Sequence, residues 1–247
     1  MRSVIAGLTM FLLTFSAMAG TFVETFNGRK LDGWEQLIQM DFEANPDSWE
    51  IIDGELQGTN RGGFLRFLTM GDEKWRNYTI EFDVKPLQKH GAGSIGIAAR
   101  VQGSSGIVSM IGDAPFPLHE DGSHVVCFGG AFHDNKFWVF GSEVNSSLKL
   151  RKWSTMKFQV DENVFTFWMN NRQVLKARDK WVDNKQALKV RDEFVQFQTG
   201  GVGLVISGYT ARFDNMVITG KDISNQGQFS VTPQAKLATT WGSLKGF

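Results

Sequence analysis

The stretch YTIEFDVK, residues 78–85, decides the fold of this chain. Its aromatic and aliphatic side chains occupy every second position, and polar or charged side chains fall between them. Because successive side chains of a β-strand point to opposite faces, this period of two predicts a strand with one buried and one wet side. Pro86 follows directly, and we expect the strand to end there because proline has no backbone N–H to donate.

The same alternation recurs on both sides of this stretch, and helical periodicity is nearly absent. Alternating apolar runs lie at 49–58, 95–101, 156–161, 164–169, 202–206 and 210–218. Dipeptides typical of tight turns interrupt them, namely Asp53-Gly54, Glu162-Asn163, Asn170-Asn171 and Ser207-Gly208. Many short strands without intervening helices predict an all-β fold, an antiparallel β-sandwich, because a parallel α/β fold would need crossover helices.

Composition excludes several classes of partner. The chain has 26 Lys and Arg against 26 Asp and Glu, and no block of like charge appears. A nucleic acid or an anionic membrane surface would call for a basic patch, so neither is expected. The 27 Gly, 21 Phe and 8 Trp residues are typical of tight turns around an aromatic core. The single cysteine, Cys127, lies in an apolar run and is expected to be buried and structural.

The N-terminus has the pattern of a secretory signal peptide. Arg2 supplies a positive start, Val4 to Phe15 is mostly apolar, and Ala17-Met18-Ala19 forms an A-x-A cleavage site. The apolar run is too short to span a bilayer, so an uncleaved anchor is the less favoured alternative. We therefore expect a signal peptide at 1–19 and a protein that is secreted, periplasmic or held at the cell surface.

The remaining chain divides into one domain and a tail. The alternating strands predict a single sandwich at 20–220. Residues 221–247 are polar with little alternation, which indicates a C-terminal tail outside the sandwich. That tail is either a peptide that docks another protein, with Trp241 as its anchor, or a disordered end. No later stretch is apolar enough to predict a transmembrane segment.

Several motifs resemble the concanavalin A-like (laminin-G-like) jelly-roll superfamily, and within it the 3-keto-disaccharide hydrolase domain. Residues 23–34, VETFNGRKLDGW, are similar to that family's opening, and 49–56, WEIIDGEL, to its first hairpin. Further similarity lies at 77–84, 93–100, 203–204 and 213–215. The resemblance spans Phe22 to Thr219 and implies an antiparallel jelly roll. Because its motifs are mostly structural, it indicates fold more than activity.

The chain also departs from its relatives at informative places. Gly93-Ser94-Ile95-Gly96 stands where the family has Asn-Ser-Gly-Ile, and Lys152-Trp153-Ser154 where it often has Glu-Trp-Asn. A laminarinase-type β-glucanase of the same superfamily needs a Glu-x-Asp-x-x-Glu strand for its catalytic carboxylates. Glu81 and Asp83 fill the first two places, but Pro86 occupies the third. We therefore do not expect that mechanism.

Five residues are candidates for sugar recognition, which requires flat rings for the C–H faces and polar groups for the hydroxyls. Glu81, Asp83 and Arg100 are expected on the polar side of two central strands. His133 and Trp138 lie beside a turn. The alternatives are a cross-strand ion cluster for the three charged residues and a core position for Trp138.

Catalytic and metal-binding patterns are weaker. Carboxylates in the Gly- and Pro-rich loop 113–121 would border a groove, but no spacing separates an acid from a base, so catalytic residues are unknown. The four histidines lack metal-ligand spacing, which argues against a catalytic zinc. The superfamily resemblance implies a structural Ca²⁺ held by Glu24 and Asp214, whereas Asp214-Asn215 alternatively only shapes a bend. No other cofactor is expected.

Three functions follow from these observations. The first is a secreted carbohydrate-binding or adhesion module whose partner is a glycan. The second is a hydrolase of a modified disaccharide, as the family resemblance implies. The third is an envelope scaffold protein that docks through its tail. A shared fold hosts many functions, so the arrangement of surface groups must distinguish them.

Overall fold

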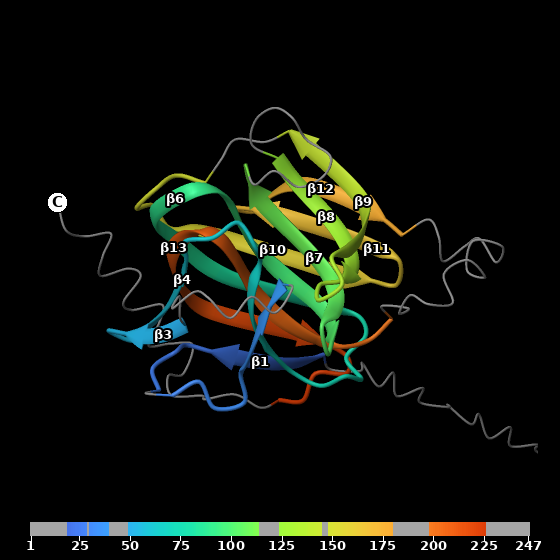
Figure 1. Cartoon of the computed structure of the whole chain (residues 1–247). Helices are drawn as coiled ribbons and strands as arrows, with labels where there is room; N and C mark the ends of the chain where they lie inside the picture. Colours follow the sequence, from blue (N-terminus) through green and yellow to red (C-terminus); the bar gives the residue numbers. More distant parts are fainter. Residues whose placement is uncertain are drawn as a thin grey trace, which may run out of the picture.

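Two long strands run through both layers of a β-sandwich and join them. The computed structural model describes residues 19–28, 30–39, 49–113, 124–144, 148–179 and 198–225. In this part of the chain the regular elements are thirteen strands, and each pairing is antiparallel. β6 (Tyr78–Gln102) pairs with β13 (Gly201–Gly220) along almost its whole length. The prediction of an all-β antiparallel jelly-roll sandwich is confirmed (Figure 1).

Each layer contains one half of β6 and one half of β13. In the first layer these halves are flanked by β10 (Ser154–Asp161), β11 (Val164–Met169) and β12 (Arg172–Arg178), and by β4 (Glu55–Asn60), β3 (Trp49–Ile52) and β1 (Gly20–Glu24). In the second layer they are flanked by β7 (Ser105–Gly112), β8 (His124–Ala131) and β9 (Lys136–Val144), and by β5 (Arg66–Met70) and β2 (Glu35–Ile38). In Figure 1, β7 and β8 pass in front of β10 and β11.

The main hydrophobic core lies between the layers. The apolar positions of the 78–85 stretch are all buried, as their alternation predicts. The Phe82 ring packs edge-on against Phe213, with centroids 5.8 Å apart, and Phe213 lies 5.6 Å from Trp49. Cys127 is buried in the same core, and this burial raises the pKa of its thiol. The expected structural thiol is therefore confirmed.

A second apolar cluster covers the other side of the second layer. Ala98 of β6 and Val205 of β13 belong to it, although their strand neighbours Ile97 and Leu204 point into the main core. Phe67 of β5 also belongs to it. The second layer is thus apolar on both faces, whereas the first layer has one apolar and one polar face.

Two expected strand ends are wrong, because β6 and β13 bend instead of ending. Pro86 is buried inside β6, opposite Ala211, where the pairing with β13 shifts its register. Such an irregularity accommodates a residue that cannot donate to the ladder. Ser207-Gly208 likewise forms no hairpin turn, since Gly208 adopts a φ of 64° inside β13 beside another register shift. These bends carry both strands from one layer to the other.

The other three predicted turns are confirmed. Asp53-Gly54 has φ values of 55° and 78°, and Asn170-Asn171 has φ values of 50° and 63°. Positive φ at both central residues is what a type I′ hairpin turn requires. Glu162-Asn163 joins β10 to β11, with Glu162 at a φ of 48°. The hairpins of the first layer therefore follow from their turn residues.

The terminal segments fall mostly outside the described residues. The described strands begin at Gly20 and end at Gly220. The expected signal peptide, apart from Ala19, the tail beyond Asn225, and Glu120 and Asp121 of the candidate loop are not described. Export and docking through the tail stay predictions. Among the described residues, no helix has the length and hydropathy to cross a membrane.

The Tyr78 hydroxyl links β6 to β13 near the end of β6 and the start of β13. It accepts a hydrogen bond from Arg100 N at 2.6 Å and lies 2.9 Å from Gly201 O, to which it can donate. Tyr78 is 3% exposed, and this burial raises the pKa of its phenol. One hydroxyl therefore satisfies a backbone donor and a backbone acceptor that water does not reach.

Replacing Tyr78→Phe should lower the free energy of unfolding by about 1–3 kcal/mol, because it leaves these buried backbone groups without a partner. Urea denaturation followed by fluorescence measures the change. Tyr209→Phe is the matched control, since Tyr209 is also buried but no hydrogen bond of its hydroxyl is found among the described residues. Equal losses in the two variants would show that the Tyr78 bonds do not stabilise the bend.

Candidate functional site

On the outward side of the first layer, an aromatic ring, a lysine and a carboxylate lie in one row across three neighbouring strands. Residues directly opposite on neighbouring strands point to the same face. Lys157 of β10 is opposite Glu81 on β6 and Trp168 on β11. Its Nζ lies 5.0 Å from the centroid of the Trp168 ring and 3.8 Å from Glu81 Oε2. The ring is half-buried, so part of its surface remains open to solvent.

A second ring lies further along the same face. Trp153 immediately precedes β10 and is 42% exposed, and Lys85 Nζ lies 4.7 Å from its centroid. Lys85 is opposite Arg212 on β13, which donates to Glu55 Oε2 at 2.9 Å and to Gln57 Oε1 at 2.9 Å. This row therefore also places an aromatic surface beside charged and hydrogen-bonding groups.

Asp83 lies between the two rows and joins three strands. Its Oδ1 accepts from Thr155 Oγ1 of β10 at 2.7 Å, and its Oδ2 accepts from Asn215 Nδ2 of β13 at 2.9 Å. Glu81 and Lys85 are four residues apart on β6, which corresponds to about 13 Å along an extended strand. The rows are therefore separated by more than one sugar ring. We call the surface formed by Trp153, Trp168, Lys85, Lys157, Glu81 and Asp83 the tryptophan face.

Arg100 does not belong to the tryptophan face, contrary to expectation. It is 3% exposed, its Nε donates to Arg76 O at 3.1 Å and its Nη2 donates to Asn77 Oδ1 at 3.2 Å. Burial lowers the pKa of its guanidinium. Arg100 has a φ of 50°, and the pairing of β6 with β7 shifts register between Ala99 and Gln102. The alternation that placed Arg100 beside Glu81 and Asp83 breaks at this irregularity.

His133 and Trp138 lie in the second layer, away from Glu81 and Asp83. Trp138 of β9 is partly buried against the main core, which supports the alternative of a core position. His133 is exposed in the turn between β8 and β9, beside the buried Phe132, and a role in binding stays a prediction. The sequence reasoning missed Trp153 and Trp168. The outward position of Trp168 in the alternating run 164–169 would have identified it.

The proposed calcium ligands are each engaged by the backbone. Glu24 Oε1 accepts from Phe26 N at 2.7 Å, and Asp214 Oδ1 accepts from Asn215 N at 2.7 Å. Among the described residues, no group of three or more His, Cys, Asp or Glu comes together as a metal site requires. Asn215 has a φ of 55°, which supports the alternative that Asp214-Asn215 shapes a bend in the chain. Calcium binding stays a prediction.

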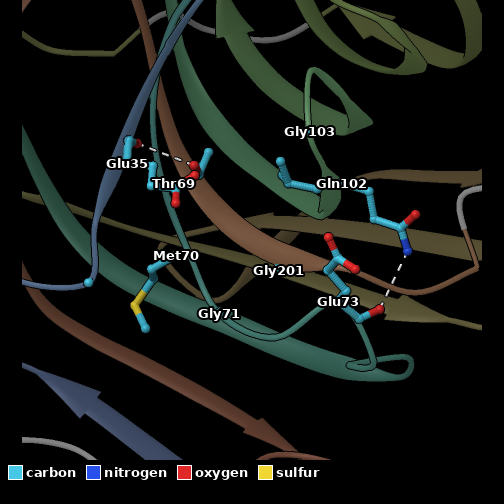
Figure 2. A pocket seen from close by; sticks show the side chains of 10 residues that line it. Glu35, Thr69, Met70, Gly71, Glu73, Gln102, Gly103 and Gly201 are labelled. Carbon is cyan, nitrogen blue, oxygen red and sulfur yellow. Dashed lines mark hydrogen bonds between the residues drawn. The ribbon is translucent and has the colours of Figure 1, made fainter.

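A separate pocket of about 190 Å³ opens at one end of the second layer (Figure 2). We call it the rim pocket. Its walls come from the start of β2, the end of β5 with the residues that follow it, and the turn between β6 and β7. Two acidic residues, Glu35 and Glu73, are part of its lining. No sequence motif predicted this pocket.

Asp83→Ala should lower the free energy of unfolding by about 1–3 kcal/mol, because it removes the acceptor of two hydrogen bonds between strands. Glu81→Ala is the control on the same face of the same strand. Its ion pair with Lys157 is longer and its side chain is 44% exposed, so about 0–1 kcal/mol is expected. Urea unfolding of both variants measures the difference, and a larger loss for Glu81→Ala would contradict the assigned roles.

Comparison with known proteins gives one match by sequence family. A family model described as the 3-keto-alpha-glucoside-1,2-lyase-like domain matches residues 21–219. This confirms the resemblance to the 3-keto-disaccharide hydrolase domain inferred from the sequence motifs. A comparison with curated proteins finds no significant match.

Solved structures share the fold at low identity. The carbohydrate binding module CBM66 from Bacillus subtilis is 18% identical, with 74% of this chain and 93% of that chain covered and a TM-score of 0.52. A Bacillus subtilis protein of unknown function with a galectin-like fold is 10% identical, with 82% and 98% covered and a TM-score of 0.52. The metal-free carbohydrate recognition domain of Emp46p is 11% identical, with 79% and 91% covered and a TM-score of 0.50.

Proposed function

The chain belongs to the 3-keto-alpha-glucoside-1,2-lyase-like domain family, and from this premise we propose that it is a carbohydrate-binding protein that holds a glycan on its tryptophan face. The observation that carries the proposal is the pair of solvent-accessible rings, Trp153 and Trp168, each beside a lysine on a rigid sheet. Aromatic side chains that are not needed in the core are available for a ligand.

The rings have the physical properties that sugar recognition needs. A tryptophan presents a large flat apolar surface with little loss of side-chain entropy, which suits the C–H face of a sugar ring. The lysine beside each ring is attracted to the negative face of its π-system and restrains its orientation. Lys85, Lys157 and Glu81 offer donors and an acceptor for hydroxyl groups. A surface with both signs of charge fits a neutral glycan better than a polyanion.

The distance between the rows indicates a ligand longer than a monosaccharide. About 13 Å separates them along β6, so one sugar ring cannot reach both tryptophans. An oligosaccharide would pass over Asp83, whose bonds to Thr155 and Asn215 hold the floor between the rings. Two carbohydrate-binding proteins with the same fold, CBM66 and the Emp46p recognition domain, support the ligand class. At their low identity they do not assign residues.

Trp153→Ala and Trp168→Ala should each weaken glycan binding roughly tenfold, because each removes about 1–2 kcal/mol of ring burial. A glycan array on residues 20–247 identifies the ligand, and calorimetry then measures the affinity of each variant. Phe64→Ala is the matched control, since Phe64 is 42% exposed, as Trp153 is, but lies outside this face. An array without any bound glycan, or an equal loss in Phe64→Ala, would refute the proposal.

Lyase or hydrolase activity is the second candidate, and the family match is the observation that favours it. Elimination across C1 and C2 of a 3-keto-glucoside needs a base for the C2 proton, which the neighbouring ketone acidifies. Asp83 is a weak candidate for that base because both of its oxygens already accept hydrogen bonds.

The binding proposal predicts no turnover beyond the uncatalysed rate when a 3-keto-α-glucoside is incubated with the protein. Chromatographic quantification of released sugar or alcohol measures this, with heat-denatured protein as the control. Protein-dependent release would establish the second candidate and would reduce the tryptophan face to a substrate-positioning surface.

A further inference from the structure

We propose that the rim pocket is a second binding site, distinct from the tryptophan face, that accepts a single neutral sugar ring. Its lining residues are Gly33, Glu35, Thr69, Met70, Gly71, Glu73, Val101, Gln102, Gly103 and Gly201. None of them belongs to the tryptophan face. Figure 2 shows Glu35 and Thr69 on one side of the pocket and Gln102 and Glu73 on the other.

Hydrogen bonds hold the pocket walls in place without a ligand. Gln102 Nε2 lies 3.0 Å from both Thr199 O and Thr199 Oγ1 and 3.4 Å from Glu73 O, which ties the β6–β7 turn to the loop after β5 (Figure 2). On the opposite wall, Thr69 Oγ1 donates to Glu35 O at 3.2 Å. A site that is already formed loses less conformational entropy when it binds a ligand.

Packing beneath the pocket keeps part of its floor free of side chains. A Cβ on Gly71 would lie 2.5 Å from the buried Trp75 ring, and a Cβ on Gly201 would lie 2.4 Å from Met70 O. Both positions therefore require glycine, and at Gly71 the φ of 115° requires it as well. A ligand can approach the backbone closely where no side chain intervenes.

The charge of the lining selects against anions. Glu35 and Glu73 are both exposed, and among the described residues that line the pocket they are the only ionisable ones, with no Lys, Arg or His. Within the described part of the chain, no hydrogen bond or ion pair engages either carboxylate. Carboxylates accept strong hydrogen bonds from hydroxyl groups, and they repel a ligand carboxylate or phosphate. The ligand is therefore rich in hydroxyls and carries no negative charge.

The size of the pocket limits the ligand to one ring. Its volume of about 190 Å³ is below the roughly 300–1,000 Å³ of pockets that enclose drug-sized ligands. Met70 and Val101 add an apolar surface for the C–H face of a sugar, while Glu35 and Glu73 offer acceptors to its hydroxyls. A terminal residue of a glycan or a free monosaccharide satisfies all of these constraints.

Ligand-observed NMR of the whole chain with a matched set of monosaccharides tests the proposal. The set contains glucose, galactose and mannose, the amino sugar glucosamine, and the anion glucuronate. We expect at least one neutral hexose to bind, and glucuronate to bind at least tenfold more weakly. The double variant Glu35→Gln and Glu73→Gln should lower the affinity for the neutral hexose at least fivefold and remove the discrimination against glucuronate.

Two controls separate this site from the tryptophan face. Trp168→Ala should leave monosaccharide binding unchanged, and Glu143→Gln, on the exposed end of β9, should leave it unchanged as well. Absence of binding by glucose, galactose and mannose would overturn the proposal, even if glucosamine binds, as would glucuronate binding equal to that of the hexoses. Loss of monosaccharide binding in Trp168→Ala but not in the double variant would refute the rim pocket as the binding site. It would leave the proposal for the tryptophan face standing.

Discussion

The hydrogen-bonded pairing of β6 with β13 is the constraint on which the rest of the structure depends. The two strands remain paired while they cross from one layer to the other, so each layer starts from the same central pair and adds strands outward. Register shifts near Pro86 and at Gly208 absorb the bend. Because β6 keeps its alternation from Tyr78 to Val84, one side of the first layer packs into the core and the other faces water.

Both proposed sites follow from this pairing. On the polar side of the first layer, Asp83 links β6 to β10 and β13, and lysines lie beside the rings of Trp168 in β11 and of Trp153 just before β10. The rim pocket lies where β6 ends and β13 begins, and its glycines are required by the close packing of Trp75 and Met70. One site is an open surface with both signs of charge, and the other is a small acidic hollow.

The sequence predicted the first layer better than the second. Alternation and turn dipeptides give the hairpins of the first layer, because its outward side chains are polar and its turns need residues with positive φ. The second layer is buried on both faces, so the segment around Ile97 and Ala98 shows no polar side. Arg100 was misplaced because an irregularity in β6 interrupts the period of two. The rim pocket gathers residues from four separate stretches of the chain, which no local pattern could reveal.

The position of a bound glycan on the tryptophan face is the central claim, and the indole N–H signals in a ¹H–¹⁵N correlation spectrum test it most directly. The chain has eight tryptophans, so each signal can be assigned by substitution. On titration with a glycan selected by array, the signals of Trp153 and Trp168 should shift, while those of the buried Trp49 and Trp75 should not. Saturable binding with no change at Trp153 and Trp168 would contradict the account.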